Sequence, residues 1–178
     1  MSATCRYDLD RDGWSELLGG EPRFRLEQVW NGLYHQGRDL SELTTLPGPL
    51  RERLAADAPL ALTEVTEAVT DGGDTVKFLW ELEGAARVET VLMHYADRAT
   101  VCLSAQAGCA MGCSFCATGQ AGFERHLSTG EIVEQLARAR RRAAEGATPR
   151  RVSNIVFMGM GEPLANYDST WAAIRRIH

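Results

Sequence analysis

A chain of 178 residues, 44% of them hydrophobic, can bury an ordinary core and is long enough for one domain plus a small accessory unit. Its formal net charge of −5 excludes a protein that is basic throughout. Apolar runs never approach the roughly 20 residues that span a bilayer, and the first twelve residues lack the apolar stretch of a signal peptide. We therefore predict a cytoplasmic protein with no membrane partner.

Helical signals dominate the first 60 residues. Apolar residues recur at helical spacing over residues 22–36, and a glycine follows them. Shorter helices are predicted over residues 40–44 and 49–56, the last of which is ended by Pro59. Residues 1–60 are thus predicted to form a small helical accessory domain.

The periodicity changes to that of strands in residues 61–98. Residues 65–69 and 75–82 are rich in β-branched and aromatic side chains, and they flank a turn signal, Asp-Gly-Gly-Asp, at 71–74. These segments predict a β-hairpin, and residues 88–95 predict a further strand. We expect this region to be a strand extension that leads into the next domain.

Strand and helix signals alternate in residues 99–178. A short buried strand is predicted over 99–104, followed by a cysteine-rich loop and a helix capped at Ser128. The apolar segment 152–158 predicts a strand that is covered on both faces. Together these elements make a βαβ unit and predict the α/β fold class. A last helix should begin near Asp168 and find nothing to pack against before the sequence ends.

Three of the five cysteines lie in one short motif. Cys109, Cys113 and Cys116 are separated by three and by two residues, so one loop can wrap their thiols around a corner of an iron–sulfur cluster. A [4Fe-4S] cluster for electron transfer usually has four cysteine ligands, whereas three leave one iron open to a small molecule. In a reducing compartment, such cysteines indicate a metal site more than a disulfide. The alternative is a zinc site with His126 or Cys102 as fourth ligand.

A second motif, Met-Gly-Met-Gly-Glu-Pro-Leu at 158–164, directly follows a predicted strand. Ligands of α/β proteins gather at the carboxyl ends of strands, where a residue such as Gly161 lets the backbone approach a bound molecule. An accessible backbone beside Glu162 suits the ammonium group of an amino acid, such as the methionyl end of S-adenosylmethionine (SAM). The alternative is an ordinary tight turn between strand and helix.

With these motifs, the sequence resembles the radical SAM RNA adenine methyltransferases of the RlmN type. The segments that carry the resemblance are residues 24–30, 88–92, 99–123, 127–133 and 159–164. The resemblance implies the first βα units of a partial (β/α) barrel, truncated here, with a [4Fe-4S] cluster on the three cysteines and SAM near Gly161 and Glu162. The complete enzyme would methylate C2 of adenosine in 23S rRNA and tRNA. It would act as a monomer served by an external electron donor.

Two further residues receive roles from this resemblance. In the family, a cysteine near the C-terminus is methylated, and its methyl carbon is then joined to the adenine ring. Glu89 matches the residue that accepts the ring proton. Strand alternation places Glu89 on the same face as Val91 and Met93, in a setting expected to be apolar. Cys102 matches the thiol that forms a transient disulfide with the methylated cysteine. Without the resemblance, Glu89 would be read as a solvent-facing residue and Cys102 as a core residue.

Several points stay open in the sequence. Ala105 stands where the family usually has serine, and no cysteine follows Cys116, so we expect this chain alone not to turn over. A radical SAM enzyme for another substrate and a non-catalytic zinc-binding RNA module are the alternatives. Six arginines could contact phosphates or could form a solvated helix end. They are Arg138, Arg140, Arg141, Arg142, Arg150 and Arg151.

Overall fold

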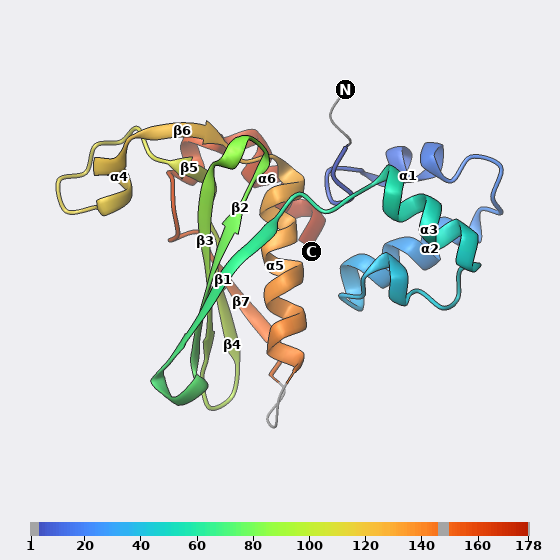
Figure 1. Cartoon of the computed structure of the whole chain (residues 1–178), viewed down its shortest axis with the longest axis horizontal. Coiled ribbons are helices and arrows are strands. Elements are labelled where there is room, and N and C mark those ends of the chain that lie inside the picture. Colours follow the sequence, from blue (N-terminus) through green and yellow to red (C-terminus); the bar gives the residue numbers. More distant parts are fainter. Residues whose placement is uncertain (1–3, 146–149, 178) are drawn as a thin grey trace.

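The computed structural model describes residues 4–145 and 150–177. Within them the chain forms an N-terminal group of helices, a five-stranded sheet and a small two-stranded sheet (Figure 1). The α-helices are α1 (Arg11–Leu17), α2 (Phe24–Trp30), α3 (Gly48–Asp57), α4 (Ala117–Ala121), α5 (Thr129–Ala144) and α6 (Tyr167–Ile177). The strands are β1 (Thr63–Thr70), β2 (Thr75–Glu81), β3 (Arg87–His94), β4 (Ala99–Cys102), β5 (Gln106–Gly108), β6 (Phe123–His126) and β7 (Val152–Val156). This mixture of helices and strands confirms the α/β class.

The N-terminal helices agree with the predicted segments and add one. Helix α2 continues as a π-helical turn over Asn31–His35, and a 3-10 turn at Leu40–Glu42 precedes α3. Helix α1 was not predicted, although Asp10 is its N-cap and accepts a hydrogen bond from the Gly13 N–H at 2.8 Å. Trp14 of α1 is completely buried. The first helix thus contributes the largest side chain of this unit's core.

The large sheet has the strand order β1-β2-β3-β4-β7. Its first four strands are antiparallel neighbours, and β4 and β7 are parallel. The predicted hairpin is β1 and β2, and the predicted βαβ unit is β4, α5 and β7. One face of the sheet packs on α5, while Figure 1 shows no helix over the opposite face in the described part of the chain. That second face will be called the open face of the sheet.

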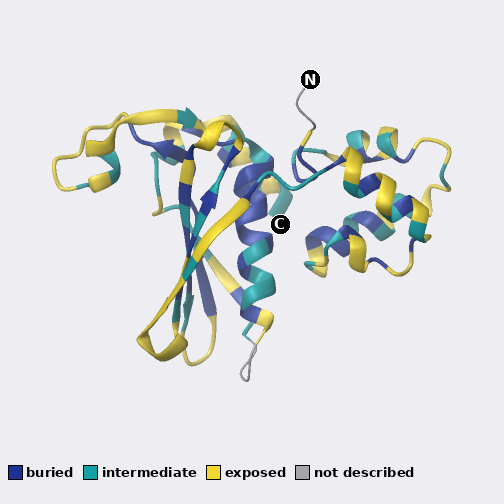
Figure 2. Ribbon diagram, viewed as in Figure 1, coloured by how far each residue is buried: buried dark blue, intermediate teal, exposed yellow. Residues whose placement is uncertain are grey.

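Helix α5 lies between the sheet and the N-terminal helices, and it is buried on more than one side (Figures 1 and 2). Ser128 and Glu131 form the predicted capping box at its start. Asp8 strengthens this cap, because its carboxylate accepts hydrogen bonds from the Ser128 hydroxyl at 2.9 Å and the Gly130 N–H at 2.6 Å. Farther along, the fully buried Glu134 accepts a hydrogen bond from the Ala61 N–H at 2.7 Å. Polar contacts therefore join α5 to the N-terminal segment and to the linker.

Three of the six arginines make ion pairs within the chain, which neither sequence interpretation anticipated. Arg141 pairs with Glu42 of the N-terminal unit at 2.6 Å, and this contact lowers the pKa of Glu42. Arg142 pairs with Glu67 of β1 at 3.0 Å. Arg138 lies 3.5 Å from Glu134 within α5 itself and donates a hydrogen bond to the Leu62 carbonyl at 3.2 Å. The contacts of these three arginines with Glu42, Glu67 and Leu62 hold α5 against its neighbours.

Two expectations about the end of the chain are wrong. Helix α6 does pack, because it lies against α5 and buries Ala173 completely. Strand β7 is an edge strand of the described sheet rather than a strand covered on both faces, and Ile155 and Val156 are half-buried. Met158 is 81% exposed. A near-continuous apolar sequence therefore did not require complete burial here.

Candidate functional site

The cysteine motif lies in a loop held between β5 and β6, a pair of strands that the sequence did not predict. Cys109 follows β5, and its N–H donates a hydrogen bond to the Gly122 carbonyl at 2.8 Å. Gly108 has φ +70°, and a Cβ there would lie 2.0 Å from the same carbonyl oxygen. Only glycine fits at this crossing. Gly108 and Gly122, which flank the three cysteines, were the sequence feature that could have indicated this hairpin.

The three thiols differ in exposure and environment. Cys109 is buried, Cys113 is exposed and Cys116 is half-buried. The Cys116 N–H donates to the Cys113 carbonyl at 3.0 Å, which makes a tight turn between these two residues. The Gly119 N–H, aided by contacts with Thr118, lowers the pKa of the Cys116 thiol. These contacts favour the thiolate form of Cys116, the form that metals bind.

The donor set of this loop suits an iron–sulfur cluster, although the described residues do not form a ready site for a single metal ion. In the described residues, His, Cys, Asp and Glu side chains form no group of three or more that could hold a metal ion. His126 Nδ1 lies 3.1 Å from Gln106 Nε2. Three thiols on one partly exposed loop, with amide donors at Cys116, provide the soft ligands that an iron–sulfur cluster requires.

The glycine motif packs directly on the segment between β4 and β5. The Met160 carbonyl accepts hydrogen bonds from Ala105 N–H at 2.8 Å and Gln106 N–H at 3.2 Å. Gln106 Oε1 accepts one from the Glu162 N–H at 2.8 Å. Glu162 Oε1 in turn accepts from the Leu164 N–H at 3.1 Å and caps the 3-10 turn at Pro163–Asn166. The second motif is thereby joined to the strand that leads into the cysteine loop.

This packing fills the space on one side of Gly161, which is itself half-buried. Gly161 has φ +90°, and a Cβ built there would lie 2.4 Å from Gln106 Cβ and 2.7 Å from Gln106 N. The space beside its Cα is filled by the protein's own chain. The glycine is required by backbone conformation and by close packing, whether or not a ligand lies nearby.

We expect Gly161→Ala to destabilise the chain more than Gly20→Ala does. Gly20 has a similar φ of +85°, but a Cβ added there would have no atom within 4 Å, so this position isolates the conformational cost. That cost is about 1–3 kcal/mol, and overpacking against Gln106 should add about 1–3 kcal/mol. Urea unfolding of both variants measures the difference. Equal losses of stability would contradict the close packing at Gly161.

Glu89 and Cys102 lie on the open face of the sheet. Val91 is the direct cross-strand partner of Cys102, so Glu89, two residues along β3, is a diagonal neighbour of the thiol. Diagonal neighbours are separated by roughly 7–8 Å. The expected apolar setting of Glu89 is wrong. Its side chain is 41% exposed, and its Oε1 lies 3.0 Å from Lys77 Nζ. Burial raises the pKa of the Cys102 thiol, and the Met158 N–H opposes this.

A buried chain of polar side chains, which no sequence pattern indicated, connects α5 to the Glu89 strand and to the glycine motif. Gln135 Oε1 accepts hydrogen bonds from the Thr90 hydroxyl at 2.8 Å and the Ser104 N–H at 2.9 Å. The Ser104 hydroxyl donates to the Glu89 carbonyl at 2.6 Å and accepts from the Met160 N–H at 2.8 Å. Ser104 and Gln135 are both completely buried. Ser104 thus contacts the Glu89 strand and the glycine motif with one hydroxyl.

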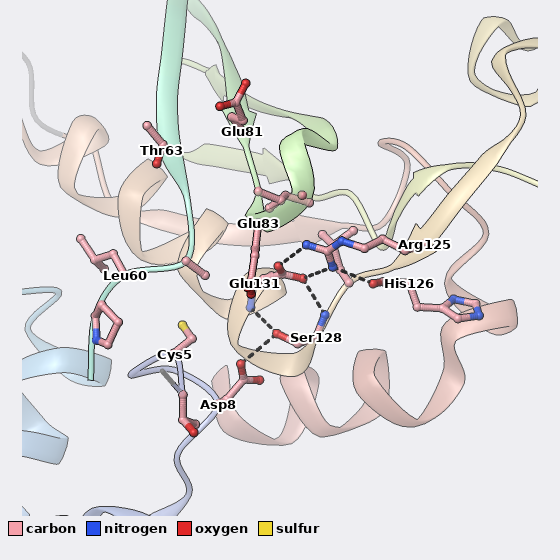
Figure 3. A pocket seen from close by; sticks show the side chains of 16 residues that line it. Cys5, Asp8, Leu60, Thr63, Glu81, Glu83, Arg125, His126, Ser128 and Glu131 are labelled. Atoms are coloured by element: carbon pink, nitrogen blue, oxygen red, sulfur yellow. Dashed lines mark hydrogen bonds and ion pairs between the residues drawn. The ribbon is translucent and has the colours of Figure 1, made fainter. Parts of the chain in front are cut away.

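A separate hollow of about 1000 Å³ lies beside the start of α5, away from the predicted site residues (Figure 3). Several of its charged groups already have partners within the chain. Arg125 binds both carboxylate oxygens of Glu131 at 2.6 and 2.8 Å, and Asp8 binds Ser128. In Figure 3 the His126 ring points away from Glu131. These contacts hold the N-terminal segment against α5.

Comparisons with known proteins agree with the motifs. No family model matches the chain. It is 54% identical over 177 residues to a protein from Salinispora tropica named probable dual-specificity RNA methyltransferase RlmN, covering 96% of this chain and 48% of that protein. A protein of the same name from Chloroflexus aurantiacus is 50% identical over 185 residues, covering 100% of this chain and 49% of that protein. The chain spans about half the length of these curated relatives.

The fold leads to the same group of proteins. A crystal structure of a radical SAM methyltransferase from Sphaerobacter thermophilus has a TM-score of 0.91 and 46% sequence identity to this chain. The match covers 98% of this chain and 52% of that one. None of the helices in the described residues combines the length and apolar character that a membrane crossing requires. Sequence and fold together match this chain to an N-terminal fragment of the RlmN type, whose structural neighbour is a radical SAM methyltransferase.

Proposed function

We propose that this chain supplies the N-terminal half of a radical SAM methyltransferase that modifies C2 of adenosine in RNA. The observation that carries this proposal is the segment Ser104 to Gln106, which contacts the backbone of Glu89 and the glycine motif and leads into the cysteine loop. Ser104 hydrogen-bonds the backbone of Glu89 and of Met160. Gln106 binds the Glu162 N–H and begins the strand that ends at the cysteine loop. The proton acceptor, the glycine motif and the cluster ligands therefore share one support.

Cys109, Cys113 and Cys116 would hold the [4Fe-4S] cluster, and SAM would bind beside Gly161 and Glu162. When bound, the cluster supplies the electron that cleaves SAM and starts the radical reaction. The partial barrel of the family would place both at the carboxyl ends of β4 and β7. The amide donors around Cys116 support this assignment, because they stabilise a thiolate ligand.

Glu89 and Cys102 would act after the methyl carbon of a second cysteine has joined the adenine ring. Glu89 takes the proton from the ring carbon while the adduct radical gives up one electron to an external acceptor, which restores the aromatic ring. The position of Glu89 on the open face leaves its carboxylate accessible. The Cys102 thiolate then attacks the sulfur of the second cysteine. An S–S bond forms, and the bond from that sulfur to the methylene carbon breaks. The electron pair stays on this carbon, which takes up a proton and becomes the methyl group. An external thiol reduces the disulfide afterwards.

The partners belong to the same proposal. The substrates would be 23S rRNA and tRNA, the electrons would come from an external donor, and the enzyme would act as a monomer in the cytoplasm. Residues 1–60 would form an accessory domain that could contact RNA, residues 61–98 the strand extension and residues 99–178 the start of the radical SAM core. The second cysteine and the remaining strands would come from sequence outside residues 1–178.

Metal content tests the proposal on this chain directly. After anaerobic reconstitution we expect iron and sulfide in the ratio of one [4Fe-4S] cluster per chain, and Cys113→Ala should lose the cluster. Cys5→Ala is the matched control, because burial raises the pKa of Cys5 to about 12 and keeps it a thiol. Stoichiometric zinc without iron would instead support the zinc-binding module. Iron lost from Cys5→Ala would contradict the assigned ligands.

A further inference from the structure

Lys77 is the one lysine among the 19 lysine and arginine residues of the sequence. It lies in β2, and its ammonium contacts Glu89 Oε1 at 3.0 Å. The two side chains are 49% and 41% exposed. Every other ion pair in the described residues uses an arginine. The chain thus has its single lysine beside the carboxylate that matches the family's proton acceptor.

The register of the sheet puts Lys77 and Cys102 on either side of Glu89. Lys77 is the direct partner of Val91 in β3, and Val91 is the direct partner of Cys102 in β4. Direct cross-strand partners share one face of a sheet, so the side chains of Lys77, Val91 and Cys102 all lie on the open face. Glu89 lies two residues along β3 from Val91 and is therefore a diagonal neighbour of both Lys77 and Cys102. The contact with Lys77 draws the carboxylate toward β2, on the side away from the thiol.

A lysine has a specific advantage over an arginine in this place. A guanidinium forms a planar fork that binds both oxygens of a carboxylate, as Arg141 does with Glu42. An ammonium is a point charge, and its contact with Glu89 involves Oε1. A carboxylate held through one oxygen can still accept a proton on the other. Lys77 can therefore fix the direction of Glu89 without occupying the atom that does the chemistry.

We propose that Lys77 is a positioning residue, which holds the Glu89 carboxylate on the open face of the sheet with one oxygen available for the substrate proton. This inference rests on the proposed function of Glu89. It assigns to β2 a part in the reaction, although the strand bears none of the cluster ligands and none of the glycine motif. The expected order of activity at position 77 is lysine, then arginine, then an uncharged residue of similar length.

The contact itself can be measured on this chain. Reductive methylation with ¹³C-formaldehyde labels Lys77 and the α-amino group alone, and dimethyl-lysine keeps its charge and one N–H donor. We expect the dimethyl-lysine signal to move in Glu89→Gln and to stay in place in Glu81→Gln. Glu81 is on the same strand as Lys77 but pairs with Arg87 at 3.0 Å. A signal unchanged by Glu89→Gln would overturn the inference.

The role in the reaction needs a full-length enzyme, built from residues 1–178 of this sequence and the remaining residues of the Salinispora tropica relative. Lys77→Met should slow release of methylated RNA at least about tenfold and accumulate a covalent protein–RNA species, while SAM cleavage continues. Lys77→Arg should recover part of the rate. Loss of folding alone would not produce the covalent species.

The outcomes distinguish the inference from the proposed function. Normal release of methylated RNA by Lys77→Met would overturn the role of Lys77 and leave the methyltransferase proposal intact. An unsubstituted full-length enzyme that binds the cluster and cleaves SAM but methylates no RNA would overturn the proposed function, and the inference with it. A rate in Lys77→Arg equal to that in Lys77→Met would contradict the need for a positive charge.

Discussion

Cys102→Ala is expected to trap a full-length enzyme carrying this sequence on its RNA substrate. Cluster assembly, SAM cleavage and cysteine methylation should all persist, because none of these steps uses the Cys102 thiol. Release should stop, because no second sulfur is available to break the bond between the protein sulfur and the methylene carbon. An RNA-shifted protein band should accumulate, and ribonuclease should trim it to a mass increment of nucleotide size.

Replacing Cys102 with alanine removes only the sulfur atom and should disturb the sheet little. Cys102 is half-buried between its cross-strand partners Val91 and Val156, so the variant should fold. Cys5→Ala is the control thiol and should release product normally. Loss of iron from Cys102→Ala would show that Cys102 is a cluster ligand. Normal product release would show that Cys102 only packs within the sheet. Glu89→Gln should also stall, one step earlier, because an amide cannot take the ring proton.

Gln135→Leu should cost about 3 kcal/mol or more of the free energy of unfolding, although leucine has nearly the same volume. The change removes the acceptor of the Thr90 hydroxyl and of the Ser104 N–H, and the donor to the Ser104 carbonyl. Each buried group left without a partner costs about 1–3 kcal/mol. Such a loss is a large part of the roughly 5–15 kcal/mol that stabilises an ordinary domain. Urea unfolding measures it.

The matched control is Gln36→Leu, at an exposed glutamine next to the π-helical turn. We expect its stability to change by about 0.5 kcal/mol or less. Ser104→Ala should resemble Gln135→Leu in direction but should cost less, because it removes the hydroxyl and keeps both backbone contacts with Gln135. If Gln135→Leu were as stable as the unsubstituted chain, the polar chain would not be a support of the site.

Local sequence patterns identified the elements whose signals lie within a few residues. The capping box at Ser128 and Glu131, the hairpin of β1 and β2, and the period of α2 are local in this sense. Spacing also singled out Cys109, Cys113 and Cys116, since ligand number and separation are properties of the chain alone. The hairpin of β5 and β6 was missed because its strands are three and four residues long and separated by fourteen residues.

The environment of the site depended on which segments meet in space. Helical periodicity predicted one apolar face for α5. In the structure the sheet and the N-terminal helices cover two sides of this helix, so Glu134 and Gln135 are buried as well. Alternation correctly put Glu89 with Val91 and Met93, yet only the pairing of β2 with β3 shows that Lys77 makes their face charged.

Sequence by itself therefore determined the family that this chain resembles, the cluster motif and the order of most elements, because each depends on residue types at fixed spacing. Tertiary structure decided that Gly161 faces Gln106, that Ser104 joins the Glu89 strand to the glycine motif, and that Lys77 and Cys102 flank Glu89. These contacts join residues from separate strands and loops. Their register is set by sheet pairing and close packing across the whole fold, which no short segment contains.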